Sequence, residues 1–223
     1  LFTDIDGTLT PPDEPGKPLK EALDALRELA KAMPVAVVTT KECAFAKQAV
    51  PFAAGYACIN GVEILAGGYR AVADDLRPEL LEGLADELEA AGAQLKRTSA
   101  GLLAGATIDW RGRAPPRGLE GLLAEAERRG LQVIRYRAHP LADLYASKRN
   151  KGDGVKALKA LLGVKYVVYL GDSENDLPAW RLADVRIIVR HKYNAELKAE
   201  GLVPVPQADL AKYLADVAGS LRA

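Results

Sequence analysis

Two aspartates stand close together near the start of the chain, in the segment LFTDIDGTLT at residues 1–10. If the first five residues form a strand, Asp4 and Asp6 point to the same side of it, because side chains in a strand alternate with a period of two. Carboxylates this close repel each other unless a cation or a shared proton lies between them. The pair therefore favours a divalent metal site, and an Asp/Gly turn that simply ends a strand is the plain alternative.

Polar residues also follow two later apolar segments. The run at 35–38 leads into two threonines, and the run at 165–170 leads into the sequence GDSEND at residues 171–176. In open α/β sheets, ligands bind beyond the carboxyl ends of the strands. We therefore expect these polar residues to meet the first two aspartates at one edge of a sheet.

The expected site combines carboxylates, hydroxyls and a lysine, with no histidine or cysteine. Its candidate residues are Asp4, Asp6, Thr39, Thr40, Lys151, Asp172 and Asp176. Ligation by oxygen alone selects a hard cation, and a site with room for phosphate oxygens favours Mg²⁺. A phosphate group suits a position between a metal, a lysine and a hydroxyl. The sequence thus predicts Mg²⁺ as the cofactor and a small-molecule phosphoester as the substrate.

Less specific interpretations of the same residues stay open. Asp172 and Asp176 would also suit the first turn of a helix, where the helix dipole favours negative charge. Lys151 would also suit a solvated loop, since Lys148 and Arg149 stand beside it.

Composition excludes several classes of protein. The chain has 223 residues, of which 49% are apolar and 27% charged, and its net charge is zero. A neutral chain has no general attraction to nucleic acid or to an anionic membrane. No apolar run approaches the roughly 18–20 residues of a membrane-spanning helix. We expect a cytoplasmic protein, a monomer or homodimer, with no nucleic-acid or membrane partner.

Cysteines and histidines are few. Cys43 and Cys58 are too few for a disulfide framework or a zinc site, and their apolar neighbours predict core packing. His139 and His191 match no motif, so we expect them at the surface.

The hydrophobic pattern predicts an α/β fold with an insertion. Strand and helix patterns alternate in residues 1–75 and 148–223, which indicates a Rossmann-like, doubly wound parallel sheet as the core. Residues 76–147 follow the order α-β-β-α-β-β instead, which predicts an inserted α+β cap with two helices on one face of a small antiparallel sheet. Helices are expected at 19–32, 42–50, 78–91, 119–129, 154–162, 195–200 (capped by Asn194) and 209–221.

Alternation within the cap strands assigns their two faces. Ile108, Trp110, Ile134, Tyr136 and Leu144 are expected on a dry face against the cap helices. The opposite face then carries Thr107, Asp109, Arg111, Arg135, Arg137, Asp143 and Tyr145. We expect this polar face to cover the site, with Arg111, Arg135 and Arg137 as substrate ligands. A solvated face whose charges pair among themselves is the alternative.

These motifs, in this order, resemble those of the haloacid dehalogenase-like (HAD) superfamily of aspartate-based phosphatases. The family motifs D-x-D-G-T-L, strand-plus-hydroxyl, lysine and G-D-x-x-N-D are matched by residues 4–9, 37–39, Lys151-Gly152 and 171–176. The insertion is similar to the type IIB cap of phosphoglycolate, trehalose-phosphate and mannosyl-phosphoglycerate phosphatases and of phosphomannomutases. One departure is Thr39-Thr40-Lys41, where many relatives have Ser/Thr-Gly-Arg.

The resemblance implies a role for each candidate. Asp4 would be the nucleophile that forms an aspartyl-phosphate, and Asp6 the general acid and then base. Mg²⁺ would be held by Asp4, the backbone carbonyl of Asp6 and Asp172, with Asp176 ligating or behind them. The phosphoryl oxygens would be held by Thr39, Thr40 and Lys151.

The implied activity is Mg²⁺-dependent hydrolysis of a small phosphorylated metabolite, such as a sugar phosphate or a phosphoglycolate-like compound. A phosphomutase of the phosphomannomutase type would use the same aspartate. Two alternatives of another class are a signalling phospho-acceptor domain and a non-catalytic scaffold. Signalling receivers, however, place the paired acids first and the acceptor on a later strand, and they carry no such insertion.

Overall fold

The alternating apolar and amphipathic segments at the two ends of the chain build one large sheet. The computed structural model describes residues 1–137, 139–198 and 200–221. The strands of the large sheet are β1 (Phe2–Thr3), β2 (Ala36–Val38), β3 (Gly55–Cys58), β4 (Glu63–Ala66), β5 (Tyr69–Val72), β10 (Val168–Gly171), β11 (Val185–Arg190) and β12 (Leu202–Pro206). Their order is β12-β11-β10-β1-β2-β3-β4-β5, parallel from β12 to β3 and antiparallel from β3 to β5.

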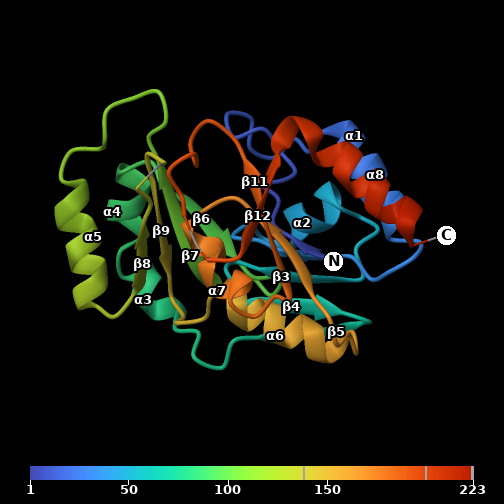
Figure 1. Cartoon of the computed structure of the whole chain (residues 1–223). Coiled ribbons are helices and arrows are strands. Elements are labelled where there is room, and N and C mark those ends of the chain that lie inside the picture. Colours follow the sequence, from blue (N-terminus) through green and yellow to red (C-terminus); the bar gives the residue numbers. More distant parts are fainter. Residues whose placement is uncertain (138, 199, 222–223) are drawn as a thin grey trace.

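Helices cover both faces of this sheet (Figure 1). One face packs against α1 (Lys20–Leu29), α2 (Cys43–Ala49) and α8 (Leu210–Ser220), and α1 and α8 lie side by side. The other face packs against α6 (Lys151–Leu161) and α7 (Leu177–Trp180), which follows the short 3₁₀ turn η1 (Glu174–Asp176). Successive residues of β2 bury their side chains on opposite faces, as expected for a strand covered on both sides.

A second sheet comes from the middle of the chain, and we call residues 76–147 the cap segment. Its strands β6 (Gln94–Arg97), β7 (Leu103–Asp109), β8 (Gln132–Arg135) and β9 (Leu141–Tyr145) pair antiparallel in the order β6-β7-β9-β8. Three helices, α3 (Pro78–Glu82), α4 (Ala85–Ala90) and α5 (Leu119–Arg128), pack on one face through a shared apolar cluster. The order of elements agrees with the α-β-β-α-β-β pattern, with the first helix divided in two.

Several predicted elements differ from the structure. The helix expected at 78–91 is interrupted where Leu84 leaves helical geometry (φ −127°) and is fully buried between Leu81 and Leu88. The helix expected at 195–200 is wrong, because its described residues form turns and irregular backbone. The edge strands β5 and β12 were not predicted, and the two prolines of β12 are tolerated because it lies at an edge.

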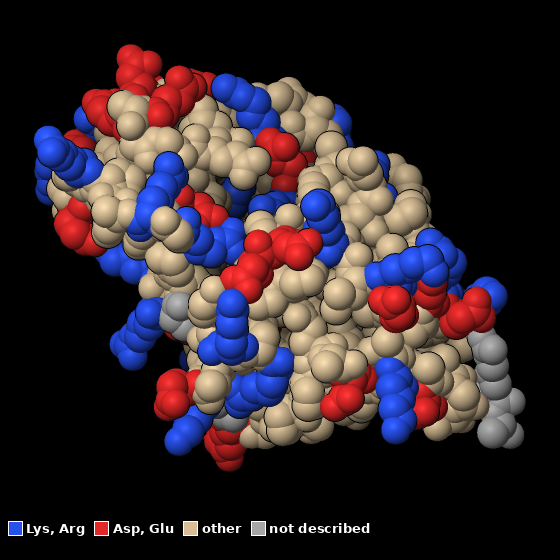
Figure 2. All heavy atoms as spheres, turned by 90° about the horizontal axis from the view of Figure 1, so that it is seen from above, with Lys and Arg blue, Asp and Glu red and all other residues tan. Residues whose placement is uncertain are grey.

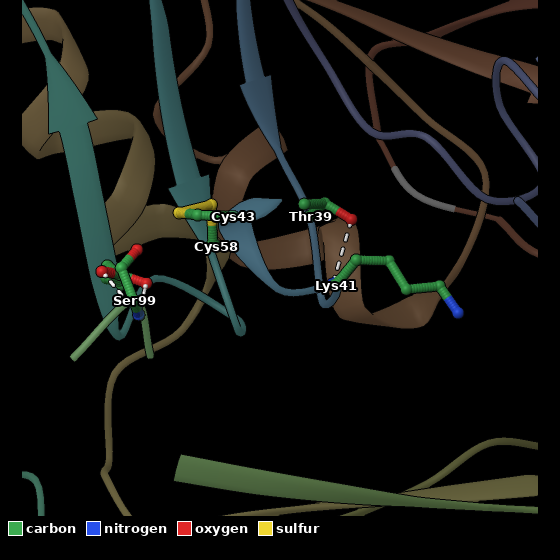
Figure 3. The surroundings of a disulfide bond; sticks show 6 residues. Thr39, Lys41, Cys43, Cys58 and Ser99 are labelled. Atoms are coloured by element: carbon green, nitrogen blue, oxygen red, sulfur yellow. Dashed lines mark hydrogen bonds between the residues drawn. A yellow bond between two sulfur atoms is a disulfide. The ribbon is translucent and has the colours of Figure 1, made fainter. Parts of the chain in front are cut away.

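A disulfide bond joins Cys43 at the start of α2 to Cys58 at the end of β3, with their Cα atoms 5.3 Å apart (Figure 3). Both residues are buried, so the expectation of core packing is right for their location and wrong for their bonding. The topology explains the pairing, since α2 follows β2 directly and β3 is the parallel neighbour of β2. Among the described helices, none is long and apolar enough to cross a membrane.

Candidate active site

Three adjacent parallel strands bring the predicted site residues together. β10, β1 and β2 are neighbours, so the residues that follow them meet at one edge of the sheet, as the sequence predicted. Gly7 permits the close approach of the first loop, because its φ is +77° and a Cβ there would lie 2.3 Å from the Asp172 carboxylate.

Asp4 lies at the centre of this edge and is 4% exposed. Its Oδ1 accepts a hydrogen bond from the backbone N–H of Ile5 at 2.7 Å, and its Oδ2 accepts one from Lys151 Nζ at 2.5 Å. Burial raises the pKa of Asp4 well above its usual value; Lys151 opposes this shift, while the carboxylates of Asp176 and Asp172 add to it.

Lys151 is the lysine of this site and is fully buried. It starts α6, three residues earlier than predicted, because Asn150 caps the helix through bonds from the N–H groups of Gly152 and Asp153. Burial alone would lower its pKa, but the carboxylates of Asp176 and Asp4 outweigh burial and raise it. The interpretation of Lys151 as a solvated lysine is therefore wrong.

Asp176 is held by the protein through both of its oxygens. Oδ1 accepts from Lys151 Nζ and from the Tyr169 hydroxyl, both at 2.7 Å. Oδ2 accepts from the backbone N–H groups of Asp172 and Ser173 at 3.0 and 3.1 Å. Asp176 thus positions Lys151 and the backbone that carries Asp172.

Asp172 has a partner on each oxygen as well. Thr8 donates to Oδ1 at 3.0 Å, and the His191 ring lies 3.0 Å from Oδ2. Burial, followed by the charge of Asp176, raises its pKa well above the usual value. One oxygen from each of Asp4, Asp172 and Asp176 lies within 4.8 Å of the other two, so we call these three residues with Lys151 the carboxylate cluster.

Asp6 and the threonines stand beside this cluster. Asp6 accepts from the Gly16 N–H at 3.0 Å and lies 3.3 Å from Lys41 Nζ. Thr39 is buried, and its hydroxyl accepts from the Lys41 N–H at 3.2 Å (Figure 3). Thr40, unlike Thr39, borders the open cavity.

A cavity of about 470 Å³ separates the carboxylate cluster from the cap sheet. Residues from both sides line it, among them Asp4, Asp6, Thr40, Lys41, Asp172, Thr107, Asp109, Arg111, Tyr136, His139 and Asp143. The prediction that a polar face of the cap sheet covers the site is therefore correct for β7 and β9. Viewed from above, basic and acidic side chains are interspersed over the surface (Figure 2).

The prediction for β8 is wrong by one residue. Ile134 pairs with Asp143 and Arg135 with Ala142, so Ile134 faces the cavity side and Arg135 the helix side. Arg135 accordingly forms ion pairs with Glu127 and Glu120. Both faces of β8 carry an apolar residue, which leaves the phase of its alternation ambiguous, and a shift of one residue exchanges the faces.

Tyr136 and Arg137 follow the same correction. Tyr136 lies over the cavity rather than on the dry face, and its hydroxyl donates to Asp143 at 2.8 Å and accepts from Asn175 at 2.9 Å. Arg137 is exposed and does not line the cavity. Arg111 is the one of the three predicted arginines that lines it, held by Asp109 and by the carbonyl of Pro12.

A buried ion pair in the cap was missed. Lys96 Nζ lies 3.0 Å from Asp143 Oδ1, and both side chains are about 5% exposed. Asp143 also accepts from Thr107 and Tyr136; burial raises its pKa, but these partners outweigh burial and lower it. We call Lys96, Thr107, Tyr136 and Asp143 the cap network. The sequence does contain an indication of this pair. Residues 94–96 alternate polar, apolar and polar, which places Lys96 on the same face of the sheet as Thr107 and Asp143.

The expectation that both histidines are surface residues is wrong for His191, whose side chain is 4% exposed. Its Nδ1 accepts from the Tyr193 N–H at 3.2 Å, so the hydrogen of the neutral ring sits on Nε2 and is donated to Asp172. Burial lowers its pKa to about 4, which keeps the ring neutral at pH 7. His191 directly follows β11, so the rule that found the aspartates would also have found it.

Asn194 supports the same loop. Its side-chain N–H groups donate to the carbonyls of Asp172 and Val189, both at 2.8 Å, and its oxygen accepts from His191 N–H. It therefore fixes the backbone behind Asp172, and does not cap a helix.

Comparison with known proteins identifies the fold. No protein-family model matches the chain, and no curated protein matches its sequence. Solved structures do match. A trehalose-6-phosphate phosphatase related protein shares 17% identity over 100% of this chain and 99% of its own, with a TM-score of 0.74. The C-terminal domain of C. albicans trehalose-6-phosphate phosphatase shares 17% identity over 98% and 92%, with a TM-score of 0.77.

A third match is a sugar phosphatase of HAD subclass IIB, with 17% identity, coverage of 97% of both chains and a TM-score of 0.68. The predicted α/β fold class is thus confirmed, and the chain has the fold of HAD subclass IIB sugar phosphatases.

Proposed function

We propose that this chain, which has the fold of the HAD sugar phosphatases, is itself a Mg²⁺-dependent phosphatase that hydrolyses a small phosphorylated metabolite. The observation that carries this proposal is the environment of Asp4. Its carboxylate is buried at the carboxyl end of β1, bonded to Lys151, and it borders a cavity of metabolite size. A carboxylate fixed in this way suits attack on phosphorus.

The carboxylate cluster fits a divalent cation. It gathers three buried carboxylates, while Lys151 is the cation that contacts two of them. Burial, with a further contribution from the neighbouring carboxylates and against the charge of Lys151, raises the pKa values of Asp4 and Asp172, so both acids are costly to ionise without a further cation. Oxygen donors in a tight group suit Mg²⁺. Asp4, Asp172 and the backbone carbonyl of Asp6 would hold it, where it would supply positive charge next to the phosphoryl oxygens.

The chain's own residues then divide the reaction between them. Asp4 attacks phosphorus and forms an aspartyl-phosphate, and Lys151 and the Thr40 hydroxyl hold the phosphoryl oxygens. Asp6, fixed by the Gly16 N–H and Lys41 beside the cavity, donates a proton to the leaving oxygen. The same carboxylate then takes a proton from the water that attacks the aspartyl-phosphate.

The cavity supports a polar leaving group of modest size. Asp109, Arg111, Tyr136 and Asp143 offer charged and hydroxyl groups opposite Asp4. These groups suit the hydroxyls of a sugar phosphate, the substrate class named for the neighbouring structures.

A panel of phosphorylated sugars and short carboxylated phosphoesters, assayed for release of inorganic phosphate, tests this proposal. We expect hydrolysis of one class of compound, loss of activity in EDTA, and better recovery with Mg²⁺ than with Ca²⁺, since Ca²⁺ prefers a larger and looser coordination shell. Transfer of phosphate to a second sugar hydroxyl without release would indicate a mutase. Full activity in EDTA would contradict the role of the metal.

A further inference from the structure

We infer that His139, His191 and Asp172 form a binding site for a transition-metal ion such as Zn²⁺, distinct in its donors from the oxygen-only Mg²⁺ site. One ligand atom from each of the three residues lies within 4.8 Å of the other two. His191 and Asp172 follow neighbouring strands of the large sheet, whereas His139 belongs to the cap segment. A metal bound here would join the cap segment to the large sheet.

The distances are close to those of a metal site. His191 Nε2 and Asp172 Oδ2 are 3.0 Å apart, and the ring centroids of the two histidines are 5.9 Å apart. Two imidazoles that bind one Zn²⁺ through nitrogens at about 2.0–2.1 Å have centroids about 5–6 Å apart. A small displacement of His139 would therefore bring the third donor into range.

The donors select the class of metal. Two imidazoles and one carboxylate favour Zn²⁺, Co²⁺ or Ni²⁺, whereas Mg²⁺ prefers oxygen ligands alone. His139 and Asp172 line the cavity, which gives an ion a path to the site. The disulfide removes both cysteines as competing ligands, and the chain has no histidines other than these two.

Binding requires one local rearrangement. His191 carries its hydrogen on Nε2, because Nδ1 accepts from the Tyr193 N–H at 3.2 Å. Ligation through the Nε2 lone pair requires the other neutral tautomer, so Nε2 loses its hydrogen to solvent and Nδ1 takes one up, and a hydrogen on Nδ1 is incompatible with the bond from Tyr193. The loop at 191–193 must therefore shift when metal binds, which gives a signal specific to this mode of ligation.

The shared carboxylate predicts a consequence for activity. Asp172 is also a proposed Mg²⁺ ligand, so Zn²⁺ at the histidine site competes for it and holds His139 over the cavity. This consequence, unlike the binding itself, rests on the proposed phosphatase function.

The direct test is Zn²⁺ binding to the full chain without an affinity tag, by calorimetry and by histidine and backbone-amide NMR. We expect one site, perturbation of both imidazoles and of the Tyr193 amide, and affinity reduced about 10-fold or more by H139A and by H191A. E174Q is the matched control, since Glu174 contributes negative charge near His139 without belonging to the site. The Zn²⁺ affinity of E174Q should stay close to that of the original chain.

Equal Zn²⁺ affinity in the original chain and both histidine variants would overturn the proposal. Loss in H191A alone would overturn the link to the cap segment. For activity, the ratio of rates with and without Zn²⁺ is compared within each variant, and inhibition should weaken in H139A. If no variant hydrolyses any phosphoester, the proposed function fails, and the binding experiment still decides the metal site.

Discussion

Two groups of buried charges face each other across the cavity and are built in opposite ways. In the carboxylate cluster, Asp4, Asp172 and Asp176 lie together with Lys151 as the cation that contacts two of them. In the cap network, Lys96 pairs with Asp143 at 3.0 Å. The first group therefore carries excess negative charge, whereas the ion pair of the second is balanced.

The pKa shifts reflect this difference. Burial and neighbouring carboxylates raise the pKa values of Asp4 and Asp172, despite Lys151. For Asp143, burial is outweighed by Lys96, Thr107 and Tyr136, and the pKa is lowered. Excess charge of one sign is a cost that a bound cation relieves, so the carboxylate cluster suits binding and chemistry. A balanced, hydrogen-bonded pair suits a fixed surface over the substrate.

The largest expected effect separates the two groups by activity. D4N should lower kcat on the order of 10⁴-fold or more, because an amide does not form an acyl-phosphate. D143N, assayed at a temperature where it remains folded, should keep kcat within about 10-fold, since Asp143 does not take part in the chemical step. Steady-state rates on the best substrate of the panel measure both. Comparable losses in kcat would contradict the division of roles.

For the free energy of unfolding without metal, the larger loss should come from the cap network and not from the carboxylate cluster. D143N leaves Lys96 as an unpaired buried charge and should cost about 3–5 kcal/mol. D172N removes one of three repelling carboxylates and keeps an oxygen and an N–H for His191 and Thr8, so it should cost nothing or stabilise. Urea unfolding in EDTA measures both variants. Equal destabilisation would show that the carboxylate cluster carries no excess charge.

The contributions of Asp172 and Asp143 to stability should depend on pH in opposite directions. The pKa of Asp172 is raised on folding, so metal-free stability should fall as pH rises from 3.8 through the folded value. The pKa of Asp143 is lowered, so its contribution is present above 3.8 and is lost as pH falls through the folded value. D172N should flatten the decline at rising pH, and D143N should remove the loss at acid pH.

Removal of the disulfide, which lies on the large-sheet side of the cavity, should have a smaller effect on stability. C43A/C58A opens a link across 15 residues of sequence and should cost about 3 kcal/mol. Backbone bonds from Ile59 and Asn60 to the carbonyls of Lys41 and Thr39 remain, so kcat/KM should change little at temperatures below unfolding. Urea unfolding of the oxidised chain and the double variant is the measurement. An unchanged free energy of unfolding would contradict a stabilising role of the disulfide.

The smallest expected effect concerns two arginines of the cap segment. R111A should raise KM for the best substrate by several-fold to about 100-fold, the equivalent of about 1–3 kcal/mol for a contact with a charged group. R135A is the matched control, because its ion pairs with Glu127 and Glu120 lie on the helix side of the sheet, and KM should stay the same. A rise in KM for R135A alone would reverse the assignment of the two faces.

The candidate site was predictable where strand ends carry it. Asp4 and Asp172 follow apolar runs, and parallel strands bring their carboxyl ends together, so no tertiary information was needed to group them. The partners of these residues were less accessible to sequence. That Lys151 contacts both Asp4 and Asp176 depends on the direction of α6, which the cap at Asn150 sets.

The cap segment was predictable in its order of elements and less so in its faces. β7 and β9 alternate cleanly, and their polar residues point to the cavity as expected. β8 is apolar on both sides, because Val133 packs against the cap helices and Ile134 against the cluster of the large sheet. In such a strand, the hydrophobic pattern does not indicate which face is directed toward the cavity and which toward the helices.

The most direct test of Asp4 is chemical. The full chain is mixed with its best substrate and Mg²⁺, quenched in acid during steady state, and digested for mass spectrometry of the N-terminal peptide. We predict a phosphoryl group on Asp4 that is absent without substrate and absent in D4N, which is also inactive. Rapid turnover by D4N, or a phosphoryl group on any other residue, would contradict the proposal that Asp4 is the nucleophile.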